Sequence, residues 1–410
     1  MNDTALGLAA LLLASSPMQA QDLKFTAIVD VWYTQMLDNN LRLNTPSAKY
    51  YPLLPAFQEN GFSVRRTELW LNGSITPDIS YQLMFDPSLV TTSGAVTGNN
   101  PSILNDATIT WKIAPAFSVK VGQFKPLQTL EGSMTSTANI LFYDRSMLAR
   151  QFGDKRDRGL VATYSFGDSK GFSGKANLGV FNGSSDFDFG KGNDRNAQKD
   201  WVARLEFAQG AFHKFGAYYR EGVTDAADKG GLVAGTGLPI SNAEILANKD
   251  RTTNLGAYYA YDTKTWQASA EAITGLLGRR SPAVFNGANA VMRQHLDQKF
   301  LGYTLSGAYK MGRHWLTARY DFLDLNSGDD FYGAVNPYKP TTGANAGADF
   351  SPAFTETILG YNYLFEASKY ALGKVKVNYI HRSKNFLQPR LGQVGEQGGD
   401  SFLVSLQIGF

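Results

Sequence analysis

Apolar and polar residues alternate with a period of two in segments that recur along the whole chain. The segment NDATITWKI is typical, because Ala107, Ile109 and Trp111 alternate with Thr108 and Thr110. The same pattern occurs at 24–36, 79–85, 159–166, 254–261, 300–309, 314–322, 357–365, 373–380 and 401–410. Successive side chains of a strand point to opposite faces of the sheet. Each segment therefore predicts a strand with one apolar and one polar face.

The predicted connections between these strands alternate between short and long. Seven are tight turns, at 74–78, 114–116, 167–171, 209–210, 262–264, 310–313 and 366–370. Eight are long and polar, at about 38–60, 87–103, 125–157, 183–199, 223–250, 278–297, 326–353 and 385–399. Together these 15 connections join 16 strands. Short and long connections in alternation, with an even strand number, are typical of bacterial outer-membrane barrels. The sequence predicts an all-β fold, a 16-stranded antiparallel transmembrane β-barrel.

The last ten residues, SFLVSLQIGF, fit the final strand of such a barrel. Phe402, Val404, Leu406 and Ile408 share the face expected to contact lipid. Phe410 lies where aromatic side chains favour the membrane interface. A closed barrel pairs its last strand with its first and leaves no exposed edge. A terminal aromatic residue on an alternating strand also resembles the sorting signal of outer-membrane proteins.

One predicted strand, GFSVRRTELWLNG, departs from simple alternation. Phe62, Val64 and Trp70 share their parity with Arg66 and Glu68. An arginine facing lipid near the middle of the membrane would cost about 2–4 kcal/mol. We therefore expect this strand to carry a β-bulge or to pack against another protomer. The aromatic residues interpreted as interfacial or packing residues are Tyr33, Trp70, Trp111 and Tyr164.

The composition favours a membrane barrel over a set of soluble domains. Charged residues make up 18% of the 410 residues, below the roughly 25% of soluble domains. The chain also contains 41 glycines, 20 tyrosines and 26 phenylalanines. A net charge of +3 is too small for a nucleic-acid-binding surface over this length. The absence of cysteine is compatible with passage through an oxidising compartment.

The first 20 residues have the pattern of a secretory signal peptide. The apolar run Ala5–Ala14 precedes a Ser/Pro break and the small residue Ala20, as at signal cleavage sites. The run is too short to span a membrane as a helix. Met1–Thr4 lacks the basic residue usual at the start of a signal, so the true translation start stays open. The expected division is a signal peptide at 1–20 and a barrel at 21–410.

The segments that resemble catalytic motifs lack the structural context or the spacing that catalysis requires. The segment GDSKG fits the G-x-S-x-G spacing, but it lies in a predicted tight turn, whereas a nucleophile elbow joins a strand to a helix. The four histidines, His213, His295, His314 and His381, are scattered and lack metal-ligand spacing. No phosphate-binding or dinucleotide-binding fingerprint follows a strand and opens a helix. The sequence predicts neither an enzyme nor a cofactor.

Residues 61–166 carry more specific motifs. They are a paired arginine in SVRRTE, the strand end GQFKP, the tripeptide DRS and the restart RDRG. In these motifs the chain resembles the phosphate-selective porin O/P family. The resemblance implies a homotrimer of 16-stranded barrels in the bacterial outer membrane. It also implies that the third long loop, here about 125–158, folds inward as a constriction loop whose cationic side chains bind anions.

The family's anion site can be carried over in part. Arg65 and Arg66 match the paired arginine, and Lys125 matches the lysine at the mouth of the inward loop. Gln128 and Thr129 stand where phosphate-specific members tend to have a serine pair. Thr137 stands where a further Arg or Lys is expected. Polar donors are retained but one charge is missing, which implies weaker selectivity for phosphate.

Other basic residues are candidates for the lumen. The loop has six basic and four acidic residues, a net charge of +2, and rings of Lys or Arg favour anions in a pore. Arg145 and Arg150, with Arg156, are pore candidates, but our preferred interpretation is that they neutralise acidic residues and fix the loop. These acidic residues are Asp144, Asp154 and Asp157. Basic residues on polar strand faces, which predict lumenal positions, are Lys112, Lys120, Lys374 and Lys376.

Two classes of function fit this sequence. One is an outer-membrane porin, a water-filled channel for passive diffusion of small solutes with a preference for anions. The other is a structural or adhesive barrel whose long outer loops bind partners. A barrel of 16 strands is wide enough for an aqueous lumen, which favours the channel. The expected partners are small anions or other solutes, outer-membrane lipid and two further copies of the chain, and no nucleic acid.

Overall fold

The computed structural model describes most of the predicted barrel. The residues that it describes are 21–37, 60–89, 103–168, 170–183, 198–224, 250–277, 284–286, 289–291, 298–325, 327–328, 353–367, 369–387 and 397–410. The predicted signal peptide at 1–20 and much of the predicted long connections lie outside these ranges. The signal peptide therefore stays a prediction. No helix in the described ranges is long and apolar enough to cross a membrane.

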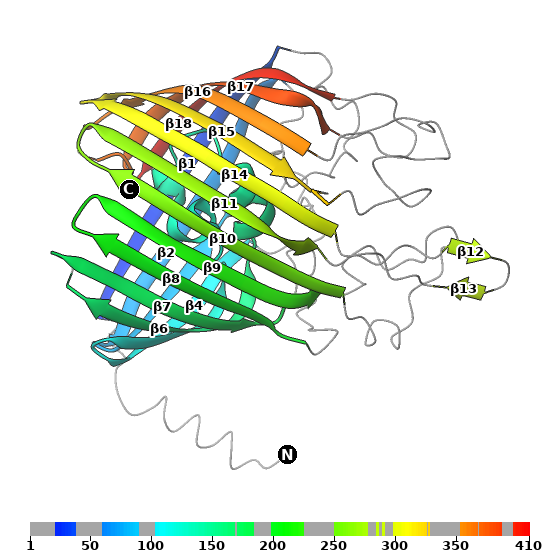
Figure 1. The fold of residues 1–410 in the computed structure, drawn as a ribbon. Helices are drawn as coiled ribbons and strands as arrows, with labels where there is room; N and C mark the ends of the chain where they lie inside the picture. The colour runs from blue at the N-terminus through cyan, green and yellow to red at the C-terminus, as the bar shows by residue number, and fades with distance from the viewer. Residues whose placement is uncertain are drawn as a thin grey trace.

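Sixteen strands form one closed antiparallel barrel, which confirms the predicted fold (Figure 1). The first eight are β1 (Gln21–Met36), β2 (Gly61–Thr76), β3 (Ile79–Phe85), β4 (Leu104–Ala114), β5 (Phe117–Phe124), β6 (Asp157–Gly167), β7 (Phe172–Phe181) and β8 (Asp200–Gln209). The other eight are β9 (His213–Thr224), β10 (Asp250–Asp262), β11 (Trp266–Leu277), β14 (Gln298–Met311), β15 (His314–Asp324), β16 (Ala353–Leu364), β17 (Gly373–Leu387) and β18 (Gln397–Gly409). A separate hairpin pairs β12 (Val284–Asn286) with β13 (Asn289–Val291).

The barrel closes between its first and last strands, as predicted. β1 pairs with β18 in a register that runs from Ile28 opposite Gly409 to Met36 opposite Ser401. The side chains of Ser401, Leu403, Ser405 and Gln407 are buried inside, whereas Phe402, Leu406 and Ile408 face outward and are exposed. The seven short turns lie between the strands where the sequence predicted them, and Figure 1 shows the short turns gathered at one end of the barrel.

A β-bulge in β2 resolves the broken alternation of that strand. Asp30 lies opposite Arg66, but the next residue, Val31, lies opposite Val64, so Arg65 is the extra residue. Before the bulge Phe62 faces outward, and after it the parity of the strand is reversed. The prediction of a bulge is thereby confirmed. The reversed parity turns the Trp70 side chain toward a cavity in the lumen, so Trp70 does not lie at the membrane interface.

The segment from 125 to 156, which we call the inward loop, lies inside the barrel (Figure 1). It contains three short helical turns, η3 (Thr129–Met134), η4 (Thr137–Asn139) and η5 (Ala149–Gly153). A further turn, η2 (Pro87–Leu89), follows β3. The inward position of the third long loop is as the family resemblance implied.

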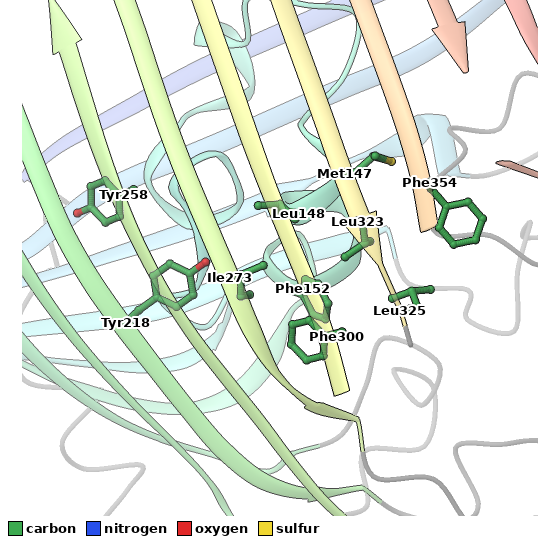
Figure 2. Packing of buried hydrophobic residues seen from close by; sticks show 10 residues of the cluster. All are labelled: Met147, Leu148, Phe152, Tyr218, Tyr258, Ile273, Phe300, Leu323, Leu325 and Phe354. Atoms are coloured by element: carbon green, nitrogen blue, oxygen red, sulfur yellow. The ribbon is translucent and has the colours of Figure 1, made fainter. Parts of the chain in front are cut away.

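Apolar packing holds the inward loop against one part of the barrel wall. Met147, Leu148 and Phe152 pack among residues of β9–β11 and β14–β16, as Figure 2 shows. The rings of Phe152 and Phe300 stack with their centroids 4.4 Å apart. A second cluster joins the loop residues Leu141, Phe142 and Tyr143 to the wall at β1 and β14–β18. The core of the protein therefore lies inside the barrel, between the loop and these strands.

Candidate functional site

A buried polar network fixes the loop on its packed side. The Arg150 Nη2 atom lies 2.6 Å from Glu356 Oε1, and the Tyr143 hydroxyl donates to Glu356 Oε2 at 2.9 Å. Arg382 donates from Nε to the same Oε2 at 2.9 Å. The Tyr143 backbone N–H donates to Asn378 Oδ1 at 2.5 Å. Burying charges is costly unless they are paired and hydrogen-bonded, so this network ties the loop to β16 and β17.

The paired arginines of β2 both reach the same loop carboxylate. Arg66 donates from Nη2 to Asp144 Oδ1 at 2.7 Å, and Arg65 donates from Nη2 to Asp144 Oδ2 at 3.2 Å. The bulge makes this possible, because consecutive residues of a regular strand point to opposite faces. The Arg65 guanidinium also lies over the Trp32 ring, 5.3 Å from its centroid. The Asp144 carboxylate therefore occupies the position at which the two arginines could bind an anion.

The other side of the loop borders an open cavity of about 380 Å³, which we call the constriction cavity. It lies between the loop and the wall formed by β2–β7. The basic residues that line it are Lys120, Lys125, Arg145 and Arg156, and the acidic lining residue is Asp106. A second cavity of about 840 Å³, the vestibule, lies at the short-turn end and is lined by Lys175 and Lys214 among others. Met134 lines both cavities.

Three of the four basic residues of the constriction cavity are held by carboxylates. Lys125 forms an ion pair with Asp154, and Arg145 Nε lies 3.2 Å from the same Asp154 Oδ1. Arg156 Nε lies 2.7 Å from Asp106 Oδ1. Arg145 also donates to the Thr135 carbonyl at 2.8 Å. These pairs position the guanidinium groups and the ammonium group at the edge of the loop.

Neighbouring charges in the inward loop shift the pKa values of Lys125 and Asp154. Burial and the neighbouring Arg145 guanidinium lower the pKa of Lys125 to about 8, although Asp154 acts against this shift. Burial alone would raise the pKa of Asp154, but Lys125 and Arg145 hold it below its ordinary value. Asp154 is therefore ionised at neutral pH, whereas the charge of Lys125 can be lost at mildly basic pH.

The two polar residues expected to orient an anion do not line the constriction cavity. Gln128 is buried, and its Oε1 accepts a hydrogen bond from Asn254 Nδ2 at 2.5 Å. Thr129 is buried as well, and its Oγ1 accepts from the Gly132 N–H at 3.0 Å. Thr137, in contrast, lines the cavity and donates to Glu68 Oε1 at 3.1 Å.

The nine predicted site residues thus fall into several groups. Lys120, Lys125 and Arg145 meet at the constriction cavity. Arg65, Arg66 and Arg150 bind carboxylates on the packed side. Lys112 shares the lumenal face of β4 and β5, where Thr110 and Lys120 are paired, but it is exposed at the short-turn end. Of the loop carboxylates, Asp154 does pair with Arg145, but Asp144 binds Arg65 and Arg66 instead.

Several residues of the site escaped the sequence analysis. Asp106, Arg319 and Glu356 lie on the polar parity of strands that the alternation had identified. Arg319 donates from Nη1 to the Asp144 carbonyl at 2.8 Å. A search for charged residues on the polar face of each predicted strand would have found Asp106 and Arg319 as lumenal residues, whereas Glu356 lies just before the predicted segment 357–365.

Comparisons with known proteins agree with this architecture. No curated protein sequence matches the chain. Its structure is similar to OmpT, an outer membrane protein of Vibrio cholerae, with a TM-score of 0.54 and 12% identity over 95% of this chain and 97% of that one. For the outer membrane channel DcaP of Acinetobacter baumannii the TM-score is also 0.54, at 12% identity over 95% and 97% of the two chains. For an anion-selective porin from Comamonas acidovorans the TM-score is 0.50, at 10% identity over 95% and 99%.

Because the sequence identity to these structures is low, the structural similarity shows only the fold. The family is shown by a match of the sequence to a family model. The model of the family described as phosphate-selective porin O and P matches residues 56–385, most of the chain. Proteins of this family and fold are channels of the bacterial outer membrane and not enzymes. The match extends far beyond the motifs of residues 61–166 that first carried the resemblance, so the chain belongs to the phosphate-selective porin O and P family.

Proposed function

We propose that this outer-membrane porin conducts small solutes with a preference for anions, and that they pass through the constriction cavity and then the vestibule. The observation that carries the proposal is the charge of the constriction cavity, which is lined by four basic side chains and one acidic one. Basic rings in a pore attract anions and repel cations. The Comamonas acidovorans porin that shares this fold is described as anion-selective.

The proposed path lies on one side of the loop because the other side is packed. There, Arg150, Tyr143 and Glu356 form buried hydrogen bonds between the loop and the wall. A solute on that side would have to break paired charges, which is costly. On the open side, the loop edge and β2–β7 leave a cavity of about 380 Å³. The open side of the loop is therefore also the side that is lined by basic residues.

Reversal potentials across a planar bilayer under a KCl gradient test the anion preference. Lys125→Glu changes the local charge by two units inside the constriction, so the reversal potential should move toward that of potassium. Lys369→Glu is a matched control, because Lys369 pairs with Glu366 in an exposed turn. A reversal potential that Lys125→Glu leaves unchanged would contradict the proposed path. A purified barrel that does not conduct would favour the structural or adhesive alternative.

The same recording measures the binding of phosphate, which we propose to be weak. The basic pair Arg65 and Arg66 holds Asp144. Gln128 is bound to Asn254 of the wall, and the Thr129 side chain faces Gly132 within the loop. Phosphate should therefore block the chloride current only at about millimolar concentration or above, near −4 kcal/mol of binding free energy. Block at micromolar phosphate would contradict this part of the proposal.

We also propose that the mature protein begins at Gln21, the first residue of β1, and assembles as a homotrimer. The signal pattern of residues 1–20 supports the first point, and membership of the family supports the second. The mass of the chain and of the assembly, measured on protein purified from outer membranes, tests both points.

A further inference from the structure

Lys120 differs from the other basic residues of the constriction cavity. Lys125, Arg145 and Arg156 each lie within an ion pair. The ammonium of Lys120 instead lies over the ring of Phe124, 4.7 Å from its centroid. Among the described residues no carboxylate lies within ion-pair distance of Lys120. Asp106, the acidic residue of the cavity lining, is held by Arg156 at 2.7 Å.

Apolar side chains form part of the wall around Lys120. Val161 lies directly opposite Lys120 on β6, on the same lumenal face. Trp70 and Met84 lie opposite each other on β2 and β3 and line the same cavity. The apolar residues of the lining are Trp70, Met84, Phe124, Leu127, Met134 and Val161. Lys120, which forms no direct ion pair with a described residue, is thus set beside aromatic and aliphatic side chains.

This arrangement suits an organic anion better than a hydrated inorganic one. An inorganic phosphate must exchange its water shell for several charged or polar donors, and the other cations here are already paired. An aromatic carboxylate needs one cationic partner for its charge and apolar surface for its ring. Binding sites for small organic molecules combine such apolar walls with a few placed polar groups.

We propose that the constriction cavity is a binding site for organic anions with an apolar body, with Lys120 binding the carboxylate and with Trp70 contacting the ring. The inference rests on the proposed passage of anions through this cavity and names the class of solute that is retained there. Such a solute would be enriched at the constriction, whereas chloride would pass with little binding.

Block of the single-channel chloride current by benzoate tests the site, with acetate and phosphate as comparison anions. Wild-type protein should be half-blocked at a benzoate concentration at least about tenfold lower than for either comparison anion. Acetate carries the same charge without a ring, so it isolates the contribution of the apolar wall. Equal block by benzoate and acetate would overturn the proposal.

Variants assign the site to its residues. Lys120→Gln should raise the half-blocking benzoate concentration about tenfold or more, and Lys120→Arg should largely retain the block. Trp70→Leu should weaken block by benzoate and leave block by acetate unchanged. Lys369→Gln, in the exposed turn, is the control. Heat-modifiable migration in gels shows that each variant is folded. Unchanged benzoate block in folded Lys120→Gln would also overturn the proposal.

The anion preference and the organic-anion site can fail separately. The reversal potential under a KCl gradient reports the preference in the absence of benzoate. A wild-type channel without anion preference that is still blocked by benzoate through Lys120 would refute only the proposed function. An anion-preferring channel that benzoate blocks no better than acetate would refute only the organic-anion site.

Discussion

The Lys125 side chain helps to fix the inward loop and also contributes a positive charge to the pore. It directly follows β5 and pairs with Asp154, which Arg145 shares. The pair fixes the ammonium at the cavity, but burial and Arg145 lower the pKa of Lys125 to about 8. Arginine side chains stay charged at every pH of interest. Unlike the arginines of the cavity, Lys125 is therefore suited to change the charge of the pore at mildly basic pH.

The anion preference should fall as the pH rises. Below pH 8 the Lys125 ammonium is charged, and above it the neutral amine predominates, because its pKa is about 8. Reversal potentials measured between pH 6.5 and 9.5 should decline with a midpoint near 8. Lys125→Gln should start from the lower preference and remove this step. A midpoint near 8 that persists in Lys125→Gln would assign the titration to another group.

The inward loop is an element held together by two close contacts between its turns. Thr129, the first residue of η3, has a left-handed backbone with φ of 55°. Its side chain faces Gly132 of the same turn and Gly153 of η5. A Cβ atom added at Gly153 would lie 1.8 Å from Thr129 Oγ1 and 2.9 Å from the Gln128 carbonyl oxygen. The two turns can approach this closely only because glycine occupies both facing positions.

Gly153→Ala should therefore loosen the loop. The added methyl group must push η5 away from η3, and overpacking of this kind costs about 1–3 kcal/mol. We expect a lower temperature for the heat-modifiable transition in gels and a noisier single-channel current. Gly171→Ala is the control, because a Cβ atom there meets nothing within 4 Å. A transition at the wild-type temperature in Gly153→Ala would show that the turns adjust without cost.

The strands could be predicted from the sequence, whereas the contacts of the loop could not. Alternation is a local signal that identified many of the barrel strands, and the order of short and long connections supplied the others. The break in alternation near Arg65 indicated the bulge as one of two possibilities. The partners of the loop are remote, since 206 residues separate Arg150 from Glu356 and 235 separate Tyr143 from Asn378. Such pairs arise only when the barrel closes around the loop. The family resemblance supplied the inward fold, but not which acidic group each arginine would bind.

Closure of the barrel is a property of the whole molecule, and its seam depends on the last residue. The Ala27 N–H donates to the Phe410 carbonyl at 2.7 Å, and the Phe410 N–H donates to the Ala27 carbonyl at 3.0 Å. The rings of Phe25 and Phe410 are 6.4 Å apart between centroids. Unpaired backbone groups are costly at the membrane. The seam therefore gains from both the backbone and the side chain of Phe410.

Deleting Phe410 should impair folding of the barrel into the membrane and leave synthesis of the chain unchanged. The deletion removes both hydrogen bonds to Ala27 as well as the ring contact with Phe25. Phe410→Ala keeps the backbone pair and loses only the ring, so its yield of heat-modifiable barrel should fall between those of the deletion and the wild type. Yields are compared by gel on outer-membrane fractions against total chain in whole cells. A wild-type yield from the deletion would contradict this role, and equal defects in the two variants would assign the effect to the aromatic ring alone.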